Sequence, residues 1–207
     1  MPRERAFDTA EALTRATDVF AEHGFRGTSL TMLTEATGLG RQSLYNAFGD
    51  KQQLYLQALD DAVARAGIPI AAMAAAASGR DALSIFFDAL LQRCISPELA
   101  ERRCIVSCGL LEGLDEPQVN GALREKWQAS HELVRAQVER GQKDGSIRSA
   151  EPSASLADLL MSQMSGLRVS AAAGMPAQRL RRQAELALAV LDLPAPEPHA
   201  QAPPQRR

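Results

Sequence analysis

The sequence predicts an all-α protein of about nine helices, in which a three-helix N-terminal domain with a helix-turn-helix precedes a larger helical domain. Aromatic residues make up only 4% of the 207 residues and alanine is abundant, which favours closely packed helices over sheets. No run of alternating β-branched residues indicates a strand. Hydrophobic residues make up 45% of the chain, which is enough for a sizeable core. We expect domains at residues 1–50 and 51–193, followed by a proline-rich, disordered tail at 194–207.

Capping residues delimit the N-terminal helices. Asp8 is an N-cap candidate for the first helix, and the hydroxyls of Thr28 and Ser29 are candidates for the second. Asp50 is an N-cap candidate for the fourth helix, with Gln53 at the offset of a capping box. The predicted helices cover residues 8–23, 29–37, 41–48 and 51–66.

The second and third of these helices have the layout of a helix-turn-helix, joined by a glycine-containing turn at residues 38–40. Leu44 and Phe48 lie four residues apart and are expected to bury one face of the third helix. The polar residues of that helix then face outward: Arg41, Gln42, Ser43, Tyr45 and Asn46. Arg, Gln and Asn make bidentate contacts to purine edges in the major groove, and hydroxyls reach phosphates. The pattern favours DNA recognition, and a helical hairpin that makes only protein contacts is the alternative.

The region from residue 16 to residue 54 resembles the N-terminal domain of the TetR family of one-component bacterial repressors. The resemblance rests on Phe20, Gly24-Phe25, Thr28, Ala36, Gly38, Leu44-Tyr45, Phe48 and Lys51. Two positions depart from the family pattern. Met32-Leu33 replaces its usual Ile-Ala, and Gly40 replaces a common Ser or Thr, which removes one potential cap and phosphate contact. The resemblance implies that the fourth helix, residues 51–66, links the two domains, since ligand binding in the family tilts this helix and changes the spacing of the recognition helices.

The expected partner is double-stranded operator DNA, contacted by Thr28, Ser29, Gly40, Arg41, Gln42, Ser43, Tyr45, Asn46 and Lys51. The net charge of −2 argues against broad, charge-driven binding of nucleic acid. Residues 26–51 contain only three basic residues and two acidic ones. The contact must therefore be local, and pairing with a second copy would double it.

The last two predicted helices begin near residues 152 and 176 and carry long apolar faces. Two such helices from each of two chains can bury one another as a four-helix bundle. The expected interface of this homodimer is Leu156, Leu160, Gln163, Leu167, Leu180, Ala184, Leu188 and Leu191. The alternative is that these residues form only internal core. Residues 145–148 and 165–174 also resemble the C-terminal domain of some TetR-family members.

Further helices are predicted over 81–94, 96–113 and 117–143, and they supply apolar walls with few polar groups, as a small-molecule pocket needs. The candidate pocket for an unknown inducer is Phe86, Phe87, Leu90, Cys108, Leu111, Trp127, His131, Met161, Met164 and Ser165. Plain core packing is the alternative for each of these residues.

The chain contains three cysteines and no apolar segment typical of a signal peptide or a membrane span. These features favour a reducing cytoplasm, where the protein would associate with the nucleoid, and no membrane partner. Cys104 and Cys108 lie four residues apart, next to Arg102 and Arg103. Thiols near guanidinium groups can react with oxidants or electrophiles, so this pair is a candidate redox sensor. An inert buried thiol is the alternative.

Enzyme motifs are missing from the sequence. It contains no Glu-x-x-His pair, no His-x-x-x-His, no Cys-x-x-Cys, no nucleophile elbow and no phosphate-binding loop. We therefore expect neither a catalytic activity, nor a metal site, nor a cofactor. The two function hypotheses are a ligand-responsive repressor and a helical sensor or binding protein.

Overall fold

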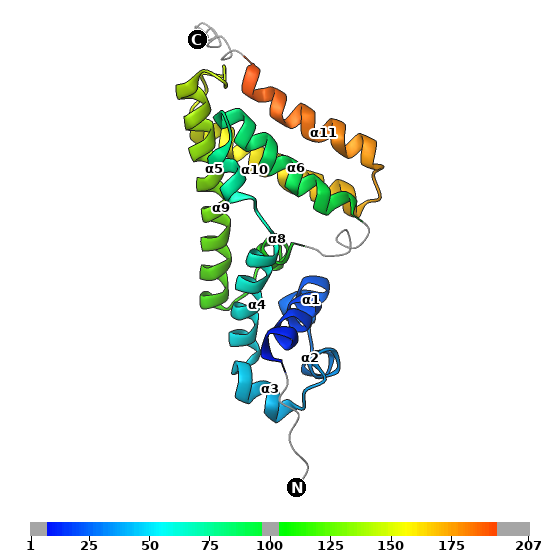
Figure 1. Ribbon diagram of the computed structural model, residues 1–207. Helices are drawn as coiled ribbons and strands as arrows, with labels where there is room; N and C mark the ends of the chain where they lie inside the picture. The colour runs from blue at the N-terminus through cyan, green and yellow to red at the C-terminus, as the bar shows by residue number, and fades with distance from the viewer. Residues whose placement is uncertain (1–7, 97–103, 194–207) are drawn as a thin grey trace, which may run out of the picture.

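The computed structural model describes residues 8–96 and 104–193, and these residues are helical apart from caps, turns and short connections (Figure 1). The elements are α1 (Thr9–Gly27), α2 (Leu30–Thr37), α3 (Arg41–Phe48), α4 (Lys51–Arg65), α5 (Ile70–Ala75), α6 (Gly79–Ile95), α8 (Ile105–Glu112), α9 (Pro117–Asp144), α10 (Ser153–Ala172), α11 (Ala177–Ala189) and the 3-10 turn η1 (Val190–Asp192). The all-α prediction is confirmed over these residues, and α3 has the predicted bounds. Helix α5 was not predicted, because Pro69 beside an alanine-rich stretch indicates a break. The start of the helix predicted over 96–113 and the tail at 194–207 lie outside the described residues.

Of the predicted N-caps, Asp8, Ser29 and Asp50 are confirmed, whereas Thr28 is the C-cap residue of α1. Asp8 Oδ1 accepts hydrogen bonds from the backbone N–H groups two and three residues after it, at 2.9 and 3.3 Å. Ser29 Oγ accepts from the N–H of Met32 at 3.2 Å. Asp50 and Gln53 form the reciprocal capping box, with N–H to side-chain distances of 2.8 and 3.3 Å. Local sequence signals therefore fix where these short helices begin.

A lower core contains buried side chains of the four helices α1, α2, α3 and α4, together with those of α8 and the start of α9. Tyr55 of α4 meets the rings of Phe20 and Phe25 edge to face, with centroids 5.0 Å away in both cases. Ile105 of α8 and Leu123 of α9 belong to the same buried cluster. This core does not end at residue 50, where the sequence analysis divides the domains, because the buried side chains of α4 all pack into it.

An upper core lies between α6, α9, α10 and α11 and consists mainly of Leu, Ala, Met and Phe side chains. Helix α9 has 28 residues, so it is about 42 Å long and runs along both cores (Figure 1). Helices α3 and α11 lie toward opposite ends of the elongated molecule. Within residues 8–96 and 104–193, no helix is both long and apolar enough to cross a lipid bilayer.

Candidate nucleic-acid interface

Helix α3 is oriented by the apolar residues on its inner face. Leu44 and Phe48 are 1% and 3% exposed, and Leu33 of α2 is fully buried in the same core. Gly38 closes α2 in the left-handed conformation with φ of 71°, which lets the chain turn tightly between the two helices. The turn and this packing leave the other face of α3 pointing away from the protein.

The outward face of α3 carries the polar set that the sequence predicted. Arg41, Gln42, Ser43 and Asn46 are exposed, and Tyr45 is half-buried. The Arg41 guanidinium lies 5.6 Å from the centroid of the Tyr45 ring. Gln42 Nε2 donates to Asn46 Oδ1 at 3.0 Å, one turn further along the helix. These contacts order side chains with the donor and acceptor groups that read base edges in the major groove.

The start of α3 has the second feature of a DNA contact. Its N-cap is Gly40, which is exposed and offers no side chain to cap the helix. The first N–H groups of α3 therefore have no side-chain partner and carry the positive end of the helix dipole. Such a helix N-terminus can bind a phosphate of the DNA backbone.

Two residues of the predicted contact set behave differently at the start of α2. Ser29 is exposed, so its hydroxyl is accessible while it caps α2. Thr28 is only 1% exposed, and its hydroxyl donates to the backbone oxygen of Gly24 at 2.6 Å. Thr28 is therefore corrected to a structural residue, because its buried side chain cannot contact DNA.

Lys51 begins α4 beside this surface and is partly buried. Its Nζ lies 4.7 Å from the centroid of the Phe25 ring. Burial lowers the pKa of Lys51, against the opposing effect of the nearby Glu112 and Glu116 carboxylates. The Lys51 ammonium thus lies over the Phe25 ring and near the carboxylates of Glu112, at the end of α8, and Glu116, before α9.

The predicted pocket residues do not form one site. Phe86, Phe87, Leu90, Met161 and Met164 are all buried in the upper core, and Trp127 packs against it. Ser165 donates its hydroxyl to the backbone oxygen of Met161 at 3.1 Å. Nε2 of His131 lies 2.9 Å from Asp158 Oδ1 and so joins α9 to α10.

Leu111 and Cys108 lie apart from the pocket residues of the upper core. Both lie on α8, which packs with α1, α4 and α9 near the lower core. The Leu111 side chain is 87% exposed, so it is not a wall of an interior pocket. The sequence could not reveal this, because the spacing of apolar residues along a helix does not say which core the helix joins.

The predicted dimer residues also need correction. Leu156, Leu160, Leu167, Leu180, Ala184 and Leu191 are at most 6% exposed, because α10 and α11 bury these faces in the core of their own chain. Only Gln163 and Leu188 of the predicted set are half-buried rather than buried. The alternative reading as internal core therefore holds for six of the eight residues.

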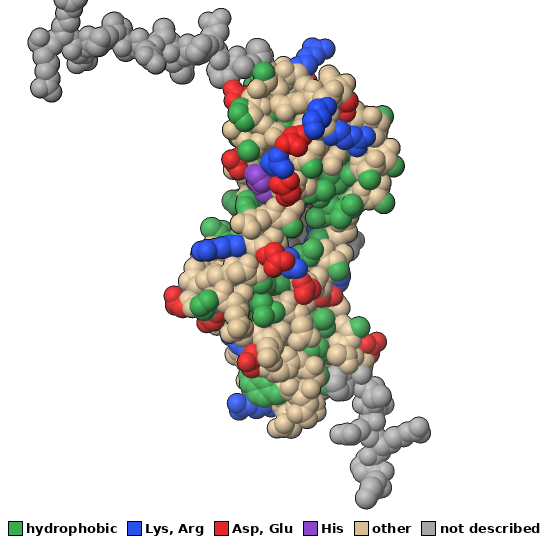
Figure 2. All heavy atoms as spheres, turned by 90° about the vertical axis from the view of Figure 1, so that its left-hand side faces the viewer, with side chains coloured by type: hydrophobic (Ala, Val, Ile, Leu, Met, Phe, Trp, Pro, Cys, Tyr) green, Lys and Arg blue, Asp and Glu red, His purple; other side chains and the backbone are tan. Residues whose placement is uncertain are grey.

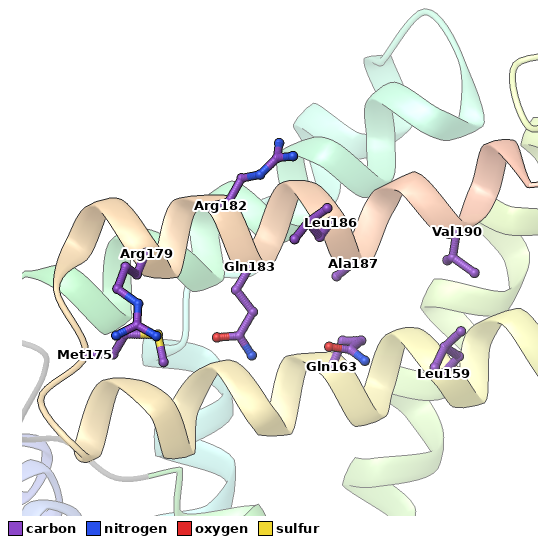
Figure 3. Close-up of a pocket in the computed structure, with 9 residues that line it drawn as sticks. All are labelled: Leu159, Gln163, Met175, Arg179, Arg182, Gln183, Leu186, Ala187 and Val190. Carbon is purple, nitrogen blue, oxygen red and sulfur yellow. The ribbon is translucent and has the colours of Figure 1, made fainter.

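A surface groove of about 460 Å³ lies instead on the outer side of α10 and α11 (Figure 3). It is lined by Leu159, Gln163, Met175, Arg179, Arg182, Gln183, Leu186, Ala187 and Val190. Leu159 and Leu186 are 39% and 56% exposed, and together they give the groove an apolar surface that is open to solvent. Helix α10 supplies Leu159 and Gln163 to this groove, and α11 supplies Leu186 and Ala187 beside polar residues, so neither helix shows a clear apolar pattern on this side.

The cysteines differ in their surroundings. Cys104 is the N-cap residue of α8. Burial alone would raise the pKa of its thiol, but the Arg168 guanidinium and hydrogen bonds from Ser107 and Val106 outweigh burial and lower the pKa. Burial raises the pKa of Cys94, against the opposing effect of Arg168 and Arg93. Arg102 and Arg103, the guanidinium groups named from the sequence, lie outside the described residues.

Charged side chains of both signs share the face of the molecule that Figure 2 draws. Figure 2 shows acidic and basic side chains interspersed over the face in view, without a continuous basic patch. This agrees with the expectation that any nucleic-acid contact is local. Within the described parts of the chain, no group of three His, Cys, Asp or Glu residues is arranged to hold a metal ion.

Comparison with known proteins places this geometry among regulators. Residues 12–58 match the model for the bacterial regulatory proteins of the tetR family. The chain is 49% identical over 59 residues to the uncharacterized HTH-type transcriptional regulator YezE of Bacillus subtilis, which covers 28% of this chain and 30% of that protein. It is 42% identical over 55 residues to the HTH-type transcriptional repressor AcnR of Corynebacterium efficiens, covering 27% and 29%. These matches span less than a third of the length of either relative.

A solved structure is similar over nearly the whole chain. It is a cysteine mutant of the TetR family transcriptional regulator CifR, complexed with 26bp double-strand operator DNA. The two chains are 34% identical, with 90% of this chain and 98% of that chain covered and a TM-score of 0.80.

Proposed function

Because the chain belongs to the TetR family of bacterial regulatory proteins, we propose that it is a homodimeric repressor that binds a palindromic operator and releases it when a small molecule binds. Members of this family are DNA-binding transcription regulators and not enzymes. The site of action is then the DNA in the cytoplasm, at the nucleoid.

The outward face of α3 is the observation that carries the proposal. Gln42 and Asn46 present amide groups that match adenine, and Arg41 presents the guanidinium that matches guanine. Ser43, Tyr45 and Lys51 lie within the same surface and supply donors for phosphates. A polar face that only contacts solvent would not need side chains that match base edges. The start of α3, which has no side-chain cap, adds a site for a phosphate.

The proposed dimer contact is the groove on α10 and α11. Leu159, Leu186 and Val190 give it an apolar floor, and Arg179 and Arg182 lie at its side. A second copy related by a two-fold axis would cover the same groove with its own leucines, as an isologous interface requires. Two copies of α3 then face two half-sites of a palindrome.

The proposed inducer site is the upper core between α6, α9 and α10, where Phe86, Phe87, Met161 and Met164 meet. A second candidate input is covalent and is favoured by the lowered pKa of Cys104. Its thiolate would attack the β-carbon of an α,β-unsaturated carbonyl compound, forming a C–S bond while the resulting enolate takes a proton from water.

Binding to DNA fragments that flank the coding region tests the proposal. We expect fluorescence anisotropy at moderate salt to detect binding to a palindrome, and Gln42→Ala and Tyr45→Ala each to weaken it by about tenfold or more. Gln128→Ala, an exposed glutamine on α9, is the matched control and should bind like the wild type. If no palindrome is bound and Tyr45→Ala changes nothing, the helical hairpin serves protein contacts instead.

A further inference from the structure

The last residue of α8 is hydrogen-bonded to the backbone of α1, across most of the N-terminal half of the chain. The N–H of Phe25 donates to Glu112 Oε2 at 2.9 Å, and the N–H of Arg26 donates to Glu112 Oε1 at 3.2 Å. One carboxylate therefore serves two successive backbone N–H groups. Neither residue type nor spacing in the sequence indicates this contact.

A break inside α1 explains why these N–H groups need a partner. Gly24 has φ of 72° and ψ of −179°, so the helical path is interrupted there and restarts at Phe25. The first N–H groups after such a break lack a helical partner, and a carboxylate is the preferred cap for them. The positive φ favours glycine at this position, and a Cβ there would lie 2.4 Å from Glu112 Oε1 and would displace the carboxylate.

Arg26 makes the contact reciprocal. Its guanidinium donates to the backbone oxygens of Glu112 and Gly113 at 3.4 and 3.1 Å. It also pairs with the Asp115 carboxylate at 2.9 Å. Glu112, at the end of α8, thus caps the backbone N–H groups where α1 restarts. Arg26 of α1 in turn caps the end of α8, where the helix dipole favours positive charge. We call these two residues the Glu112–Arg26 joint.

The joint lies beside the groups that position the DNA-facing helices. Phe25 lies under the Lys51 ammonium and against the Tyr55 ring, and both of these residues belong to α4. Tyr55 also approaches α8, since a Cβ at Gly109 would lie 2.7 Å from its hydroxyl oxygen. A displacement of the end of α8 would therefore reach α1 and α4 together.

The other end of α8 faces the upper part of the molecule. Cys104, the N-cap residue, is electrostatically coupled to Arg168 of α10. Helix α8 therefore has one end near the upper bundle and the other at the restart of α1. An eight-residue helix spans only about 12 Å, so α8 connects these two regions over a short distance.

We propose that the Glu112–Arg26 joint fixes the orientation of the α1–α3 head relative to the C-terminal helices and transmits displacements of α8 to it. Glu112 and Arg26 are positioning residues that touch no DNA. The consequence for operator binding rests on the proposed function, whereas the orientation of the head does not.

The orientation is measured without DNA by the distance between two spin labels. In full-length protein with its three cysteines replaced by alanine, Glu35→Cys on α2 and Gln128→Cys on α9 place labels at exposed positions on the two sides of the joint. We expect a narrow distance distribution in the parent protein and a broader or displaced one after Glu112→Ala. Arg26→Ala should do the same, and Glu112→Gln, which retains an acceptor, should fall between. Glu125→Ala, an exposed glutamate of α9, is the matched control.

Hydrogen exchange checks the joint at its own atoms. The amides of Phe25 and Arg26 should exchange about tenfold faster in Glu112→Ala, as expected for the loss of an average helix cap, and at the parental rate in Glu125→Ala. Circular dichroism establishes that each variant is folded. Unchanged distance distributions in folded Glu112→Ala and Arg26→Ala would overturn the proposal, even if the amides exchange faster.

Operator binding separates this proposal from the proposed function. If the parent protein binds a palindrome, Glu112→Ala should bind about tenfold more weakly and should discriminate less between half-site spacings that differ by one base pair. Unaltered affinity and spacing preference would contradict the positioning role. If the parent protein binds no palindrome, the repressor function fails, and the label distances alone decide the orientation of the head.

Discussion

The lower and upper cores of this protein are built from different side chains and leave different faces exposed. The lower core packs aromatic rings edge to face, and α1, α2 and α4 begin with side-chain caps. The upper core is mainly aliphatic and sulfur-containing, with one edge-to-face pair, Phe86 and Phe87. Ser78 caps α6, whereas α9, α10 and α11 begin without a side-chain cap. Side-chain caps therefore set the starts of α1, α2 and α4, whereas the starts of α9, α10 and α11 depend more on apolar packing.

The exposed faces follow the same division. The lower region turns a hydrogen-bonding face outward on α3, and the upper region turns an apolar groove outward on α10 and α11. A polar face of this kind suits DNA, and an apolar groove suits another protein surface. This difference supports the proposed DNA contact at one end of the molecule and the proposed self-association at the other.

The largest expected effect comes from placing charge in the upper groove. Leu186→Glu puts a carboxylate where two apolar surfaces should meet, so the protein should be monomeric at concentrations at which the wild type is dimeric. Operator affinity should fall by about 100-fold or more, because the two half-sites are then bound independently. Light scattering after gel filtration measures the mass, and anisotropy measures the affinity.

Ile70→Glu is the matched control for this prediction. Ile70 is 60% exposed on α5, outside the groove, and the same substitution there should leave mass and affinity unaltered. Leu160→Ala tests the other face of α10. That residue is fully buried, so its loss should lower the free energy of unfolding by about 2–5 kcal/mol while the dimer persists in the folded fraction. A dimeric Leu186→Glu protein would show that the groove is not the interface.

The same division explains what the sequence could predict. The bounds of α2 and α3 follow from Ser29, the glycines of the turn and the four-residue spacing of Leu44 and Phe48, all of which act locally. Six residues of the dimer set were misassigned because periodicity identifies the apolar face of α10 and of α11, but it does not tell whether that face meets the chain's own core or a second chain. The contact of Glu112 with Phe25 and Arg26 was missed because Glu112 is separated from them by 87 and 86 positions in the sequence. No local signal exists for a contact at that separation.

A smaller effect is expected when the reactivity of Cys104 is compared with that of Cys94, because Arg168 acts on both thiols. The pKa of Cys104 is lowered and that of Cys94 is raised, so the thiolate of Cys104 forms at lower pH. Two variants are compared, one that retains only Cys104 and one that retains only Cys94, and both carry Cys108→Ala. Alkylation by iodoacetamide should reach half its maximal rate at a lower pH in the Cys104 variant than in the Cys94 variant. Mass spectrometry follows the adduct.

Arg168→Gln is the control for that comparison, because Arg168 lowers the pKa of both thiols. Both midpoints should therefore move to higher pH in this variant. Equal midpoints for Cys94 and Cys104 in the presence of Arg168 would remove the basis for a covalent input at Cys104.

The smallest expected effect is the change in the free energy of unfolding caused by Tyr55→Phe, in the lower core at the contact between α4 and α8. The Tyr55 hydroxyl is buried and has no hydrogen-bond partner among the described residues. An unsatisfied buried hydroxyl costs about 1–3 kcal/mol, so Tyr55→Phe should raise the free energy of unfolding in urea by about 1 kcal/mol. Tyr55→Leu instead loses the edge contacts with Phe20 and Phe25 and should lower it by about 2–4 kcal/mol. If Tyr55→Phe is the less stable protein, the hydroxyl takes part in the α4–α8 contact, and the lower core depends on polar as well as aromatic packing.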